Sequence, residues 1–87
     1  MRIILVYGMS AMQTHFPLSE SKEAIHSVIH NINANGKTKA KLLGLGLGAG
    51  QDVDVIRNRR GDIVLRTGQS RISIGRGLAE KIMVVEA

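Results

Sequence analysis

Apolar and polar residues alternate along the second half of the chain, a pattern that predicts a series of short β-strands. The alternation covers residues 52–56 and 70–74, and apolar runs at residues 63–66 and 82–85 predict two further strands. A period of two residues is typical of strands that bury one face. A charged turn is expected over residues 57–62, and a short turn joins the next two strands into a hairpin. Short strands at this spacing favour a small β-barrel, which leaves few strand edges exposed.

The pattern is ambiguous over residues 24–32, where the same apolar positions fit either a helix or a strand. Four of them recur at intervals of three and four residues, as on one face of a helix. The segment also alternates well enough for a strand, so periodicity alone leaves both structures open. The positions concerned are Ile25, Val28, Ile29 and Ile32.

Residues 37–45 are predicted to form a short helix, with Leu43 on its buried face and its lysines in solvent. Gly46 is placed to end this helix in the left-handed conformation, and Gly50 provides a second structural turn before the next strand. One further helical turn is expected over residues 78–81. Two short helical segments are therefore expected beside the strands.

The composition restricts the function classes open to the chain. With 87 residues it makes one domain, and with 2% aromatic residues its core must be aliphatic. The absence of cysteine excludes a disulfide scaffold, a zinc finger, an iron–sulfur cluster and a thiol nucleophile. No arrangement of serine, histidine and carboxylate residues predicts a catalytic site, so we do not expect an enzyme. No apolar run approaches the roughly 20 residues that a membrane helix needs, and we expect a cytoplasmic protein.

The first segment of the chain differs in pattern from the rest. Residues 1–15 show no usable period beyond a short β-prone run, and Met9 and Met12 are alternative start positions. We interpret this segment as an N-terminal extension, either disordered or a mis-called start. Residues 16–87 are interpreted as the barrel domain.

The charge distribution adds a basic surface. Twelve basic and seven acidic residues give a formal net charge of +5. Arg57, Arg59 and Arg60 gather in the predicted charged turn, where nucleic acid, anionic lipid or an acidic protein could bind. No aromatic residue lies among these arginines, although proteins that bind single strands normally stack bases on aromatic rings. A nucleic-acid binder is therefore kept as an alternative that the sequence does not favour.

His26 and His30 are weak candidates for a metal site. They are four residues apart and fall on one face of a helix or a strand. A transition metal such as iron or zinc normally takes more than two protein ligands, and no third ligand is placed beside them. The ligand spacing therefore does not support a bound metal cofactor, and a metal-binding regulator is kept as a second alternative.

Residues 41–56 resemble the signature of the FeoA family, small cytosolic proteins associated with bacterial ferrous iron uptake. The matching features are a leucine-rich helical turn, the run Leu45-Gly46-Leu47, Gly50 and an alternating strand. The resemblance extends over about residues 17–85.

The resemblance implies a mainly β fold, an SH3-like small barrel of about five strands with one short helix and a final helical turn. It implies that residues 24–32 form a strand. It also implies an accessory protein of a ferrous iron transporter, which the chain would contact at the cytosolic GTPase region without entering the membrane. No catalytic residue and no cofactor come with the resemblance, and the oligomeric state stays open.

Leu45 and Leu47 are the predicted partner contact, flanked by Arg57, Arg59 and Arg60. Leucines at a glycine-containing turn can offer an apolar anchor with a polar rim. The alternative is that both leucines belong to the core, because a barrel this small needs its aliphatic residues.

Overall fold

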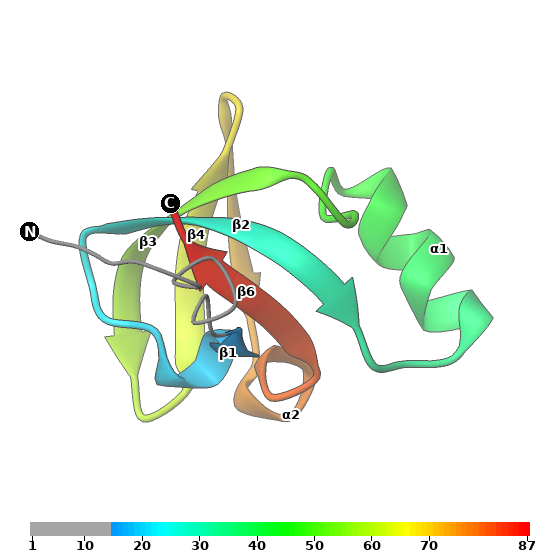
Figure 1. The fold of residues 1–87 in the computed structure, drawn as a ribbon, viewed down its shortest axis with the longest axis horizontal. Coiled ribbons are helices and arrows are strands. Elements are labelled where there is room, and N and C mark those ends of the chain that lie inside the picture. The colour runs from blue at the N-terminus through cyan, green and yellow to red at the C-terminus, as the bar shows by residue number, and fades with distance from the viewer. Residues whose placement is uncertain (1–14) are drawn as a thin grey trace, which may run out of the picture.

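A computed structural model describes residues 15–87, in which six strands form one antiparallel sheet (Figure 1). The strand order across the sheet is β1-β6-β2-β3-β4-β5, so the last strand of the chain lies between β1 and β2. The elements in chain order are β1 (Phe16–Pro17), a 3-10 turn (Leu18–Glu20), β2 (Ile25–Ile32), α1 (Gly36–Gly44), β3 (Asp52–Arg59), β4 (Asp62–Thr67), β5 (Ser70–Ile74), α2 (Arg76–Ala79) and β6 (Ile82–Glu86).

The curled sheet surrounds an aliphatic core, as the low aromatic content requires. Every strand from β2 to β6 contributes to this core, while α2 and the 3-10 turn add Ala79 and Leu18. The expected mainly β, SH3-like small barrel is confirmed. The sheet has six strands where about five were expected. The additional strand is β1, which is only two residues long and therefore too short to show an alternation pattern in the sequence. The buried core consists of Leu18, Ile29, Ile32, Leu42, Leu47, Val53, Val55, Ile63, Leu65, Ile74, Ala79, Ile82 and Val84.

The two predicted helical segments are present. Helix α1 begins and ends one residue earlier than expected, and α2 begins at Arg76, before the predicted turn. In Figure 1, α1 projects from one side of the barrel and α2 lies beneath the sheet. Within residues 15–87, no helix is long and apolar enough to cross a membrane. Apart from residue 15, the predicted N-terminal extension lies outside the described residues.

A β-bulge in β2 explains why its sequence pattern is ambiguous. Ile29 pairs with Val84 and Asn31 pairs with Met83, so His30 is an extra residue without a partner on β6. The bulge places the next buried side chain, that of Ile32, three residues after Ile29. This three-residue step imitates the spacing of a helix. The strand that the family resemblance implies is confirmed.

A second bulge lengthens β3 and shows that the predicted charged turn over residues 57–62 is wrong. The register shifts between Val55 and Arg57, after which the strand continues to Arg59. The bulge interrupts the two-residue alternation, and the polar residues beyond it resemble a loop in the sequence. Only Arg60 and Gly61, with φ of 55° and 96°, form the turn between β3 and β4. These left-handed conformations are those of a two-residue hairpin turn.

Asn58 joins this hairpin to the beginning of the barrel. Its side-chain Nδ2 donates to the carbonyl oxygens of Ser19 and Ser21 at 3.0 and 2.7 Å. Its Oδ1 accepts the Gly61 N–H at 2.8 Å, and its own N–H donates to Glu23 Oε2 at 2.8 Å. Four hydrogen bonds therefore converge on one half-buried residue of β3.

Replacing Ala24 with glycine is expected to stabilise the fold by about 0.5 to 1 kcal/mol. Ala24 has φ of 65°, a left-handed conformation that costs a residue with Cβ about 1 kcal/mol or more and costs glycine little. Urea unfolding of the two proteins measures the difference. The matched control is Ala40→Gly in α1, where glycine should destabilise by about 1 kcal/mol. Equal losses in both variants would contradict this reading of the Ala24 backbone.

Candidate functional site

Helix α1 ends in a Schellman motif that fixes the leucine-rich segment after it. The Leu47 N–H donates to the Leu42 carbonyl at 2.8 Å, and the Gly46 N–H donates to the Leu43 carbonyl at 2.9 Å. Gly46 has φ of 89°, as the predicted left-handed end of the helix requires. Gly50 also has a positive φ, of 88°, and its N–H donates to the Ile29 carbonyl at 2.7 Å. Both glycines therefore occupy turn conformations that favour glycine.

The motif sorts the four leucines of this segment into two pairs. Leu42 and Leu47 are 2% and 0% exposed and belong to the core. Leu43 and Leu45 are 66% and 47% exposed and are the large exposed hydrophobic residues among residues 15–87. The prediction that Leu47 offers a surface contact is wrong, because the reversal of the chain at Gly46 points it inward. The prediction that the helix buries Leu43 is also wrong.

Leu45 forms part of the wall of a groove between α1, β5 and α2. The groove has a volume of about 310 Å³. Strand β5 lies at the end of the sheet and pairs only with β4 among the described strands, so its other backbone edge is open beside the groove. An apolar wall next to an open strand edge suits an extended peptide segment. The lining includes Leu42, Leu45, Ile74 and Leu78, with Thr38, Lys41 and Ser73 as polar members.

Leu43 belongs to a different and smaller hollow on the side of α1. Its Cδ1 lies so close to Gly48 that a Cβ there would stand 2.6 Å away, so Gly48 makes room for this side chain. The hollow has a volume of about 230 Å³ and also includes Ile32 and Ala49. Leu43 and Leu45 thus face different grooves.

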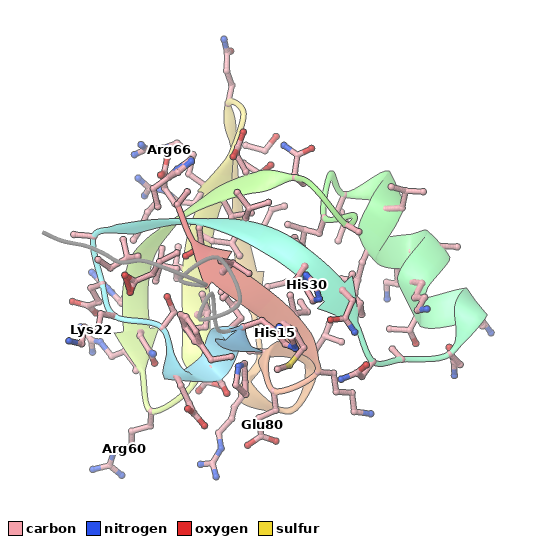
Figure 2. The ribbon with its side chains drawn as sticks, in the orientation of Figure 1. His15, Lys22, His30, Arg60, Arg66 and Glu80 are labelled. Carbon is pink, nitrogen blue, oxygen red and sulfur yellow. The ribbon has the colours of Figure 1, made fainter. Side chains whose placement is uncertain are left out.

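The structure does not place the predicted arginines around Leu45. Arg57 and Arg59 lie on β3, and Arg60 lies in the turn that follows. Figure 2 shows Arg60 at the end of the molecule away from α1. The predicted arginine rim is therefore wrong, since the long β3 carries these residues away from the leucine segment. The polar rim of the groove instead contains Thr38, Lys41 and Ser73.

His26 lies between two carboxylates of the neighbouring strand. Its Nδ1 is 2.8 Å from Asp54 Oδ1, and its Nε2 is 3.3 Å from Asp52 Oδ1. The hydrogen bond and charge of Asp54, with a smaller contribution from Asp52, raise the pKa of His26 above 6.5 despite some opposing desolvation. At neutral pH this ring is bound to carboxylates of the protein itself.

The fold is expected to lose stability as the pH rises through the raised pKa of His26. The folded-state pKa exceeds the unfolded value of 6.5, so the ion pairs contribute fully below the unfolded pKa and are lost above the folded one. Unfolding temperatures measured from about pH 6 to pH 8 should therefore fall in the wild type. They should vary less in Asp54→Asn. A His26 pKa at or below 6.5 in an NMR titration would contradict the assignment.

His30 does not act together with His26. Its ring stacks on that of His15, with centroids 4.3 Å apart and an angle of 17° between the planes. His30 also borders an open hollow of about 440 Å³ near the C-terminus. The two histidines thus have different neighbours, and residues 15–87 contain no group of three or more histidine and carboxylate residues placed to hold a metal ion. The residues described here give the metal hypothesis no support.

The family model described as the FeoA domain matches residues 16–86. A protein of Methanocaldococcus jannaschii, provisionally named Fe(2+) transport protein A, is 39% identical over 72 residues, which cover 83% of this chain and 88% of that protein. A crystal structure of an iron uptake regulatory protein (FeoA) matches with a TM-score of 0.76 and 31% identity, over 85% of this chain and 99% of the other. A manganese-dependent transcriptional repressor matches with a TM-score of 0.77 but 17% identity, over 86% of this chain and 43% of the other, and so shares the fold alone.

Proposed function

Because the chain belongs to the FeoA family, we propose that it is a non-enzymatic accessory module of ferrous iron uptake that binds the cytosolic GTPase region of a ferrous iron transporter. The 39% identical relative carries the name of an Fe(2+) transport protein, which supports a role in iron transport. The repressor-like fold match is too distant in sequence to support a regulator of transcription. The module acts from the cytoplasmic side, where the GTPase region lies.

The exposure of Leu45 beside the groove is the observation that supports a protein contact there. Leu42 and Leu47 on either side of it are buried, so the barrel does not need Leu45 for its own core. A half-exposed leucine next to an apolar hollow with a polar rim is typical of the anchor of a protein interface. The transporter segment would lie along the open edge of β5 and bury Leu45 and Leu78.

The two alternative functions find less support. A metal-binding regulator would need His26 and His30 to converge, and they contact different residues. A nucleic-acid binder would need rings on which bases stack, and β3, β4 and β5 contain no phenylalanine, tyrosine or tryptophan.

Replacing Leu45 with alanine is expected to weaken binding to the GTPase region by about tenfold, with a small effect on stability. The substitution removes an anchor from the interface, and truncating an anchor residue costs about 1 to 2 kcal/mol or more, about a factor of ten in affinity. Calorimetric titration of the purified GTPase region measures the affinity. Leu43→Ala is the matched control, because Leu43 is more exposed and faces the other hollow. Equal affinities of wild type and Leu45→Ala would refute a contact in this groove.

A further inference from the structure

The outer face of the β3-β4-β5 sheet carries four arginines. Arg57 and Arg59 lie on β3, Arg66 on β4 and Arg71 on β5, and all four are exposed. The strand register places Arg57 opposite Val64, whose neighbours Ile63 and Leu65 point into the core. This alternation puts the arginines on the solvent side of three adjacent strands.

Two of these arginines face each other directly across the sheet. Arg66 on β4 is the pairing partner of Arg71 on β5, and like charges in directly opposite positions are destabilising. Asp54 is the partner of Arg66 on the other side, but its Oδ1 is bound to His26. The fold therefore holds a repulsive pair that an external anion would relieve.

Three aspartates share this outer face, because Asp54 pairs with Arg66, Asp62 pairs with Arg59, and Asp52 lies two residues before Asp54 on β3. Each has a partner within the protein, and the arginines outnumber them by four to three. Among residues 15–87 the ion pairs involve only the basic residues His26 and Arg76. Asp62, opposite Arg59, accepts the backbone N–H of Arg76 at 2.8 Å through its Oδ1. Residues 1–14 contain neither aspartate nor glutamate, so they bring no carboxylate to neutralise the arginines.

The basic charge continues along the flank of the barrel opposite α1. Figure 2 shows Lys22, Arg60 and Arg66 on this flank, with Arg60 and Arg66 near its two ends. The groove beside Leu45 adjoins the far end of β5, where Ser73 and Ile74 line it together with residues of α1 and α2. None of its lining residues is an arginine, so the groove and the arginines form separate contacts.

We propose that the outer face of β3, β4 and β5 docks on an anionic lipid surface through the phosphates of the headgroups. Guanidinium groups bind phosphate oxygens with paired hydrogen bonds, and basic residues near an anionic leaflet each contribute attraction. The charges spread over three strands in two dimensions, which matches a planar array of phosphates better than the single line of an acidic peptide or a nucleic-acid strand. The face lacks aromatic rings for stacking bases, which further disfavours nucleic acid.

Docking through this face would be peripheral and electrostatic. The exposed side chains on it are charged or small, and Val64 at its centre is half-buried. The contact would therefore weaken at high salt, since charges at a surface are screened over about 10 Å at 0.1 M ionic strength.

Cosedimentation of the full chain with vesicles tests the proposal. We expect binding to vesicles that contain phosphatidylglycerol, little binding to phosphatidylcholine alone, and release by high salt. The double variant Arg66→Thr/Arg71→Thr should bind about 30-fold more weakly, since each basic residue near an anionic surface contributes about a factor of five. Its unfolding temperature should not fall, because the two arginines repel each other.

The control Lys37→Gln/Lys39→Gln removes two charges from exposed positions of α1 and has the same formal net charge as the double arginine variant, +3 in place of +5. It should bind the anionic vesicles much as the wild type does. Equal losses in both double variants would show that only net charge matters and would overturn the proposal. Absence of vesicle binding at low salt, or tighter binding to an RNA oligonucleotide, would overturn it as well. Leu45→Ala should retain vesicle binding, so this test and that of the transporter contact can fail independently.

Discussion

Replacing Leu47 with alanine is expected to lower the free energy of unfolding by about 3 to 4 kcal/mol. Leu47 is 0% exposed, and its N–H and the Leu42 carbonyl close the Schellman motif while both side chains lie in the core. Truncating a buried leucine reduces the apolar area that is buried and leaves a cavity. A domain of this size has a modest free energy of unfolding, so this loss is a large part of it. Urea unfolding followed by far-ultraviolet circular dichroism measures the change.

The comparison with Leu45 makes this result specific. Leu45 lies two residues before Leu47 and is 47% exposed, so Leu45→Ala should change the free energy of unfolding by less than about 1 kcal/mol. Similar losses in the two variants would mean that Leu45 also belongs to the core. That result would contradict the exposure of Leu45, and it would also contradict the proposal that the groove beside Leu45 binds a partner.

Replacing Asn58 with aspartate is expected to destabilise the fold by about 2 to 4 kcal/mol. The amide donates to the carbonyls of Ser19 and Ser21, whereas an ionised carboxylate has no donor and would face two acceptor oxygens. The acceptor for the Gly61 N–H would survive the change. The loss therefore isolates the two donated hydrogen bonds and can be measured by urea unfolding at neutral pH.

Asn33→Asp provides the matched control for this substitution. Asn33 is exposed, and its Oδ1 accepts a hydrogen bond from Asn31 at 2.9 Å, which aspartate can also accept. This variant adds the same negative charge and should stay within about 0.5 kcal/mol of the wild type. If Asn58→Asp were as mild as its control, Asn58 would not join the hairpin to the 3-10 turn.

The two bulges mark the limit of what periodicity predicts in this chain. The hairpin of β4 and β5 has no bulge, and its strands follow from the apolar run of residues 63–66 and the alternation of residues 70–74. Strands β2 and β3 each contain an extra residue, which shifts the buried positions out of step with a two-residue period. Only the family resemblance predicts β2 as a strand, and nothing in the local sequence predicts that β3 extends to Arg59.

The turn at the candidate site could be predicted from the sequence, but the residues that pack around it could not. Gly46 stands directly after the helical pattern, and its role as the left-handed end of α1 follows from local chemistry. Which leucines are buried depends on how α1 sits against β5 and α2, contacts between residues distant in sequence. The same holds for Leu78 and Ser73 in the groove and for Asn58, whose side-chain amide donates to carbonyls more than thirty positions away. Tertiary contacts of this kind leave no periodic signal.

The position of the basic surface also could not be predicted from the sequence alone. In sequence Arg57, Arg59 and Arg60 cluster at one predicted turn, but the structure places Arg57 and Arg59 on β3, on the same outer face as Arg66 of β4 and Arg71 of β5. Pairing across strands brings Arg66 and Arg71 together from positions that do not form a recognisable motif. The basic surface is therefore a property of the strand register.

The most direct test of the proposed function is an NMR titration of the isotope-labelled chain with the purified GTPase region of its ferrous iron transporter. Saturable shifts are expected at Leu45, Lys41, Ser73 and Leu78, which line the groove, while the amides of Arg57 on β3 and Arg66 on β4, away from the open edge of β5, stay unchanged. Absence of any shift at partner concentrations well above micromolar would contradict the proposal that this chain binds the GTPase region. Shifts confined to the arginine face would retain the binding but contradict the groove as its site.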